Sequence, residues 1–154
     1  MCASKVILIG WVVVLIAGWV GWGVAATDRY VSLVGTNDVA GGFTNWSGAA
    51  TNIKAAVDRA NTNNAGDTVW VASGIYNVPI TIIISNSVVR GFSGNPADIV
   101  VDGGGVTQCF VLSHTNAMLA DMTVSNGRNH LAATTLRRGG AVTVLTGQVV
   151  NAVI

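Results

Sequence analysis

The sequence predicts an all-β protein, a parallel β-helix (solenoid) that is closed at its N-terminal end by one amphipathic capping helix. Three observations carry this prediction. The 154-residue chain is rich in residues typical of strands and turns, with 19 Gly, many Asn and Thr, and Asp as its only acidic residue type. One segment alone has the periodicity of an amphipathic helix. The rest consists of short apolar runs that recur about every 30 residues.

The N-terminal segment has the pattern of a secretory signal peptide. Lys5 provides a positive charge, and the run 6–26 that follows contains no charged residue. Small residues at Ala25 and Ala26 then precede the polar Thr27, as a signal peptidase requires. We therefore expect an exported protein, either secreted or held in the cell envelope.

This segment sets the predicted domain boundaries. Residues 1–26 form the signal peptide, and residues 27–154 form the N-terminal capping segment and the first coils of the β-helix. The uncharged run 6–26 is also long enough to span a bilayer, which takes about 20 residues. An uncleaved anchor is therefore the alternative, and it is the only part of the chain for which we expect membrane contact.

The predicted helix covers residues 51–61. Lys54 and Asp58 lie four residues apart on the polar face, and Thr51 is a suitable N-cap. The apolar residues recur at the spacing of one helix face, at Ile53, Ala56, Val57 and Ala60.

The apolar runs predict strands that stack on one another. Segment 85–92 aligns with 115–122, and that segment aligns with 146–153, at intervals of about 30 residues. In this alignment Ile80 falls over Phe110. Such spacing favours a solenoid, in which each coil buries its apolar columns against the next. The runs are 68–71, 80–84, 88–92, 99–101, 109–112, 118–124, 141–145 and 149–154.

The stretch 52–76, with the helix followed by GDTV and by Gly-Ile-Tyr, resembles the opening of right-handed parallel β-helix proteins of the pectin-lyase-like superfamily. The resemblance covers residues 27–154. It implies right-handed coils with the helix over the open end of the first coil, and it carries no catalytic residue. Because the chain stops at Ile154 within an apolar run, we expect either a truncated solenoid or a last strand that pairs with another chain.

The search for chemistry is largely negative. No nucleophile motif, zinc motif or phosphate-binding loop is present, and Asp98, Asp102 and Asp121 are too scattered to predict a calcium site. The sequence therefore predicts no catalytic residue, no cofactor and no metal. The formal net charge of +1 argues against nucleic acid as a partner.

One cationic loop is a candidate binding site. Segment 127–138 contains no acidic residue, and it is interpreted either as a solvated insertion or as a contact site for an anionic polysaccharide or a lipopolysaccharide phosphate. Its basic residues are Arg128, His130, Arg137 and Arg138.

Three further positions yield local predictions. Trp70 alternates with its valine neighbours, so it lies on the opposite face, either as a sugar-stacking surface or packed under the N-terminal segment. Arg90 and Asp121 fall in nearly the same column of the repeat, which predicts an ion pair between neighbouring coils. Cys109 lies in an apolar run and is expected to be buried.

Together these observations predict an exported β-helix surface module that is non-enzymatic and either binds glycans or acts like an adhesin. The alternative is the N-terminal fragment of a polysaccharide lyase or glycoside hydrolase whose catalytic coils are absent. No obligate protein partner is predicted.

Overall fold

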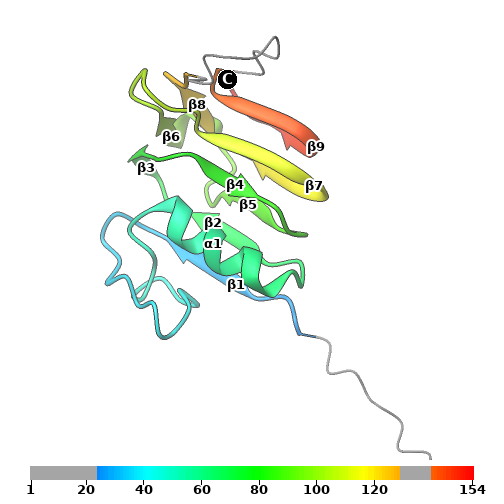
Figure 1. Ribbon diagram of the computed structural model, residues 1–154. Coiled ribbons are helices and arrows are strands. Elements are labelled where there is room, and N and C mark those ends of the chain that lie inside the picture. Colours follow the sequence, from blue (N-terminus) through cyan, green and yellow to red (C-terminus); the bar gives the residue numbers. More distant parts are fainter. Residues whose placement is uncertain (1–23, 129–139) are drawn as a thin grey trace, which may run out of the picture.

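The computed structural model describes residues 24–128 and 140–154 (Figure 1). Strands dominate this part of the chain, with one α-helix and one short 3-10 helix between them. The elements are β1 (Asp28–Val31), α1 (Ile53–Asn63), β2 (Thr68–Val71), β3 (Gly74–Asn77), β4 (Thr81–Ile83), β5 (Val88–Gly91), η1 (Pro96–Asp98), β6 (Ile99–Asp102), β7 (Phe110–Ala120), β8 (Thr123–Ser125) and β9 (Val142–Val150).

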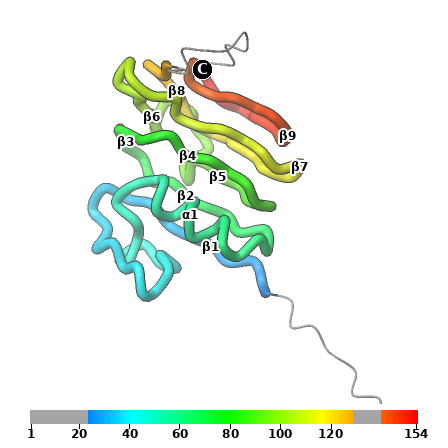
Figure 2. Tube along the Cα trace, in the orientation of Figure 1, coloured from blue at the N-terminus to red at the C-terminus, as the bar shows by residue number. Residues whose placement is uncertain are grey.

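The strands form two sheets, and every strand pairing is parallel. The larger sheet has the order β1-β2-β5-β7-β4, with β9 paired to β7, and the smaller sheet has the order β3-β6-β8. Figure 2 shows the chain rising in tiers from β1 to β9. Parallel partners cannot be joined by a tight hairpin, and each pair of partner strands here is separated in the chain by at least one other element.

The predicted pairing of distant segments is confirmed, in part with a shift of one residue. Val88 lies opposite Met118, which agrees with the alignment of 85–92 with 115–122. Phe110, however, lies opposite Thr81 rather than Ile80. The register of β7 against β9 also shifts near Leu112 because the two strands are irregular there.

Alternation along each strand creates the core. In β2, Val69 and Val71 are fully buried while Trp70 between them is partly exposed, because successive side chains point to opposite faces of a sheet. Val89 of β5 and Leu119 of β7 continue the buried column of Val69. The core therefore extends across the strands as rows of aligned apolar side chains.

Helix α1 contributes to the same core. Its predicted apolar stripe is confirmed, because Ile53, Ala56, Val57 and Ala60 are all fully buried. The N-cap is Asn52 rather than Thr51: the Asn52 side chain accepts a hydrogen bond from Ala55 N at 2.9 Å. The helix ends at Asn64 in the left-handed conformation. The predicted pair of Lys54 and Asp58 forms, at 2.5 Å.

The predicted fold class, an all-β right-handed parallel β-helix with a separate capping helix, is wrong. The strands are divided between two parallel sheets, and α1 supplies four fully buried side chains to their core. Moreover, β7 runs without interruption through the polar residues that were expected to separate two strands, and it pairs with both β4 and β5. The repeat identifies which strands pair, but it does not determine how they are grouped into sheets.

A buried ion pair attaches β1 to the rest of the fold. Arg29 is 6% exposed, and its Nε donates to Asp67 Oδ2 at 2.7 Å, while Nη1 donates to the Gly42 carbonyl at 2.7 Å. Asp67 is fully buried, and its other oxygen accepts from Asn63 Nδ2 at 2.6 Å and from Thr27 N at 2.9 Å. All oxygens and donors of this network are therefore paired, as a buried charge requires.

The predicted signal segment lies mostly outside the described residues, which begin at residue 24. Within the two described ranges, no helix is long and apolar enough to cross a membrane.

Candidate functional site

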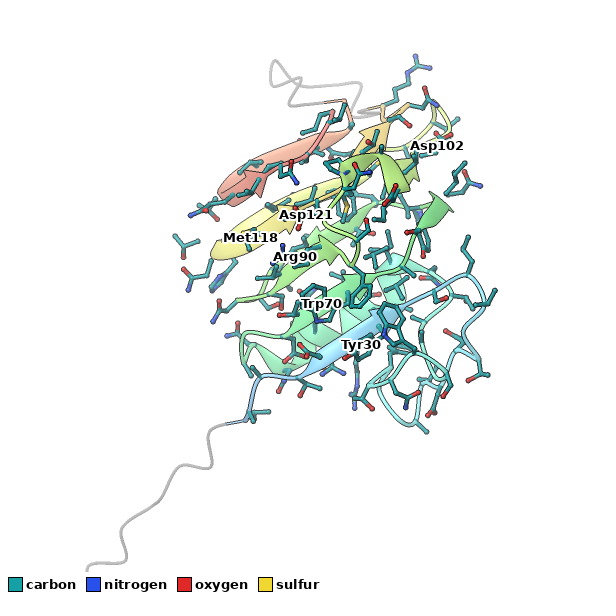
Figure 3. All side chains as sticks on the ribbon, turned by 180° about the vertical axis from the view of Figure 1, so that it is seen from behind. Tyr30, Trp70, Arg90, Asp102, Met118 and Asp121 are labelled. Carbon is teal, nitrogen blue, oxygen red and sulfur yellow. The ribbon has the colours of Figure 1, made fainter. Side chains whose placement is uncertain are left out.

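A row of side chains crosses the outer side of the larger sheet. Tyr30 of β1 lies opposite Trp70 of β2, and Trp70 lies opposite Arg90 of β5. Each projects away from the core because its strand neighbours are buried. Figure 3, seen from behind, shows the three residues on successive strands. With strands about 4.8 Å apart, the row spans about 10 Å across the sheet.

Two further aromatic residues join this row from loops. Trp46 comes from the segment that follows β1, and its ring centroid lies 4.6 Å from that of Tyr30. Phe92 directly follows β5, and its ring lies 4.9 Å from Trp46 and 5.9 Å from Trp70, both nearly edge to face. We call Tyr30, Trp46, Trp70, Phe92 and Arg90 the aromatic face.

Backbone hydrogen bonds hold these loops in position. Tyr30 N donates to the Phe43 carbonyl at 2.8 Å, and Ala50 N donates to the Tyr30 carbonyl at 2.9 Å, so the chain on both sides of Trp46 is attached to β1. Phe92 N donates to the Val71 carbonyl at 2.8 Å. The aromatic rings are thus carried by ordered backbone.

The aromatic face is open to solvent. Phe92 is 59% exposed and Trp46 is 37% exposed, while Tyr30 and Trp70 are half-buried beneath and beside them. Single exposed apolar residues are common on protein surfaces, but contiguous apolar patches often mark contact sites, and here the four rings form a chain of contacts.

Polar groups border one side of the aromatic face. The Arg90 guanidinium lies 5.3 Å from the centroid of the Trp70 ring, and its Nε and Nη2 donate to Asp121 Oδ2 at 3.0 and 2.5 Å. This confirms the predicted ion pair. Asp121 Oδ1 accepts from Asn151 Nδ2 at 2.8 Å. Burial alone would raise the pKa of Asp121, but the hydrogen bonds from Asn151 and Arg90 and the charge of Arg90 outweigh burial and lower that pKa.

Of the four basic residues predicted to form a binding site, the structure describes Arg128. Arg128 is exposed, and its backbone N donates to the Thr107 carbonyl at 2.8 Å, beside the turn after β6. His130, Arg137 and Arg138 lie outside the described residues, so the cationic loop stays a prediction.

An open groove of about 300 Å³ lies at this turn, and it holds Asp102 as its one carboxylate. That carboxylate accepts from Gly104 N at 2.8 Å. Among the described residues that line the groove there is no second acid or base. It is lined by Asn77, Val78, Asp102, Gly103, Gly104, Val106 and Thr107.

The described residues contain no group of three His, Cys, Asp or Glu side chains that could hold a metal ion. Cys109 is fully buried, as predicted, and burial together with the charge of Asp102 raises its pKa to about 11. It is therefore a protonated apolar side chain at neutral pH and not a nucleophile.

Sequence reasoning singled out Trp70 but missed the other aromatic residues. Tyr30 and Trp70 are neighbours only through strand pairing over a long stretch of chain, and Trp46 lies in a segment without periodicity. The one local signal was the alternation of Trp70 with Val69 and Val71, which places the Trp70 ring on the face opposite these valines.

No protein-family model, curated protein or solved structure matches this chain. The resemblance to the pectin-lyase-like superfamily therefore stays a prediction.

Proposed function

We propose that this chain is an exported, non-enzymatic glycan-binding module and that the aromatic face is its binding surface. The exposed row of aromatic rings bordered by Arg90, Asp121 and Asn151 carries this proposal. The C–H faces of a sugar ring are apolar and slightly positive, so they pack on the negative face of an aromatic ring. Neighbouring polar groups then bind the hydroxyls.

The charges around the aromatic face favour a neutral glycan. The segments 24–50, 68–71 and 88–98 contain only two cations, Arg29 and Arg90. Both are already paired with carboxylates, Arg29 in the core and Arg90 at the surface. The remaining charges of these segments, including Asp38 and Asp98, are exposed carboxylates. An acidic polysaccharide would therefore meet repulsion at this surface.

Affinity electrophoresis of the full-length chain through gels that contain neutral or acidic polysaccharides tests the proposal. We expect retention by at least one neutral glycan, and a Kd about tenfold higher for Phe92→Ala and for Trp46→Ala, as for aromatic residues at the centre of a contact. Ile84→Ala is the matched control, because Ile84 is 58% exposed, close to the 59% of Phe92, but lies next to β4. Its Kd should change less than about twofold.

Three results would contradict the proposal. Absence of retention by every glycan would contradict the function itself. Retention that survives both aromatic substitutions would contradict the assigned surface. If binding is restricted to acidic glycans and is lost in the double variant Arg137→Ala and Arg138→Ala, the cationic loop rather than the aromatic face is the site.

A further inference from the structure

The buried carboxylate of Asp67 lies at the first residues of the predicted mature chain. Asp67 Oδ1 accepts the backbone N–H of Thr27 at 2.9 Å and Asn63 Nδ2 at 2.6 Å. Arg29 occupies the other oxygen, Oδ2. The side chain of Asp67 is fully buried, and its bond with Arg29 is buried, whereas the bonds from Thr27 and Asn63 lie partly open to solvent.

Thr27 is also the residue that follows the small residues of the predicted signal peptide. Ala25 and Ala26 are exposed, whereas Thr27 is partly buried and its carbonyl already accepts from Thr68 N at 3.2 Å. The ordered sheet thus begins one residue after the expected cleavage point, and the nitrogen exposed by cleavage is the one that Asp67 binds.

We propose that cleavage after Ala26 creates an α-ammonium group on Thr27 that forms a partly buried ion pair with the buried carboxylate of Asp67. In this step a signal peptidase hydrolyses the Ala26–Thr27 peptide bond with one water molecule. The Ala26 carbonyl carbon gains the hydroxyl oxygen and leaves as a carboxylate, and the Thr27 nitrogen gains protons to become the ammonium. A neutral donor at 2.9 Å from Asp67 is thereby replaced by a charged one.

The new ammonium faces charges from each element packed around it. Asp67 attracts the ammonium. Arg29 on β1 is bound to the same carboxylate, and its positive charge repels the ammonium. Asp28 is the adjacent exposed acid, and helix α1 presents the neutral amide of Asn63. Arg59 of α1 approaches Gly42, the residue bound by Arg29, and adds a second positive charge farther along. The ion pair is favourable because, of the charged groups named here, Asp67 is the one that bonds directly to the Thr27 nitrogen.

The pH dependence has a defined sign. A free α-amino group has a pKa of about 7.7–8.0, and contact with Asp67 raises that pKa in the folded state. The added stability is therefore fully present below about pH 7.7 and is lost as the pH rises through the folded pKa. The uncleaved chain has a peptide nitrogen at this position and lacks this transition.

Expression of the full-length chain in an exporting bacterial host, followed by intact mass measurement and N-terminal sequencing, tests the cleavage. We expect a product that begins at Thr27. A product that begins elsewhere or retains residues 1–26 overturns the proposal, whether or not the protein binds glycans.

Amine labelling tests the ion pair in the same product. At pH 7 we expect the α-amine of Thr27 to react at least about tenfold more slowly in the folded chain than in the urea-unfolded chain, because the ion pair with Asp67 favours the ammonium and so lowers the fraction of reactive free amine. Lys54, which is 39% exposed, serves as the internal control and should change little. Equal protection of the two amines overturns the proposal. Between pH 7 and 9.5 the secreted product should lose more thermal stability than the uncleaved chain, and identical losses also overturn it.

Discussion

Two strands of the larger sheet that each pair with only one neighbour, β1 and β9, are covered in different ways. The free edge of β1 is covered, because Ser32 N donates to the Ala50 carbonyl at 2.9 Å, and the side chains behind β1 pack against α1 and the ion pair of Arg29 with Asp67. At the other end, Val144 and Val150 of β9 remain 46% and 45% exposed. Strand β1 is therefore stabilised by tertiary contacts as well as by pairing, whereas β9 is stabilised mainly by pairing with β7.

This difference teaches that position in the sheet, rather than residue type, determines the cost of a substitution here. Val69 and Val71 of β2 are fully buried, whereas Val144 and Val150 of β9 are about half exposed, and the regular alternation of β2 is lost in β9. Substitutions at the β1 end should therefore cost much more free energy of unfolding than equivalent ones at the β9 end.

The largest effect is expected for Asp67→Ala. It leaves the guanidinium of Arg29 buried without its partner, so the free energy of unfolding should fall by about 3–5 kcal/mol. Asp58→Ala, which removes the exposed partner of Lys54, should cost less than about 0.5 kcal/mol. Urea denaturation of the full-length chain followed by circular dichroism measures both. Similar costs for the two variants would show that the Arg29 network does not hold β1.

The next largest difference is expected between two truncations of apolar side chains, one in α1 beside β1 and one in β9. Ile53→Ala removes a fully buried side chain of α1 and should cost about 3 kcal/mol. Val144→Ala on β9 should cost less than about 1 kcal/mol, because its side chain is 46% exposed and leaves no closed cavity. Denaturation midpoints of the two variants sharpen the comparison, and equal losses would mean that the β9 end is covered as tightly as the β1 end.

A smaller effect is expected for Asp121→Asn, midway between the two ends. Asn retains the left-handed backbone at φ 58° but loses the charge that binds Arg90, so at pH 7 the cost should be about 1–2 kcal/mol. The folded pKa of Asp121 is lowered, so its contribution is fully present above about pH 3.9 and is lost as the pH falls through the folded value. The difference in stability between the wild type and the variant should shrink as acid protonates the folded carboxylate, and a difference that stays constant as the pH falls would exclude the ionised carboxylate as the cause.

The smallest effect is expected for Lys54→Ala on the outer side of α1. This side chain is 39% exposed and pairs with Asp58 four residues later, so its loss should cost about 0.3–0.5 kcal/mol. Addition of 1 M NaCl should abolish most of that difference, because salt screens exposed pairs. A cost above about 1.5 kcal/mol would place Lys54 in a tertiary contact instead.

Local features of the fold were predictable from the sequence. The helix stripe from Ile53 to Ala60 and the strand alternation around Trp70 depend on short-range periodicity, and both are confirmed. The pairing of Val88 with Met118 followed from the repeat. Register was predicted less well, since irregularities in β7 and β9 near Leu112 shift the alignment by amounts that no local pattern reveals.

The fold class and most of the candidate site were not predictable. A repeat reports which segments are similar, but grouping into two sheets depends on the connections between them. The aromatic face is assembled from β1, a loop, β2 and the end of β5, so its rings meet only after the strands pair. Only Trp70 carried a local signal, through its alternation with Val69 and Val71.

Three corners of the chain, at Gly91 after β5, at Asp121 and at Asn151, lie against one another. They indicate where this chain can change in length. A Cβ on Gly91 would lie 2.1 Å from the Asp121 carbonyl oxygen, and Asp121 in turn bonds Asn151, which adopts the same left-handed conformation at φ 45°. Adding or deleting one residue within a strand would move every later corner out of this column. Insertions are therefore expected to be accepted near Gly105, where an added Cβ would meet no heavy atom within 4 Å, and rejected within the strands. The molecule thus separates a part whose length is fixed by stacking from turns that are free to diversify.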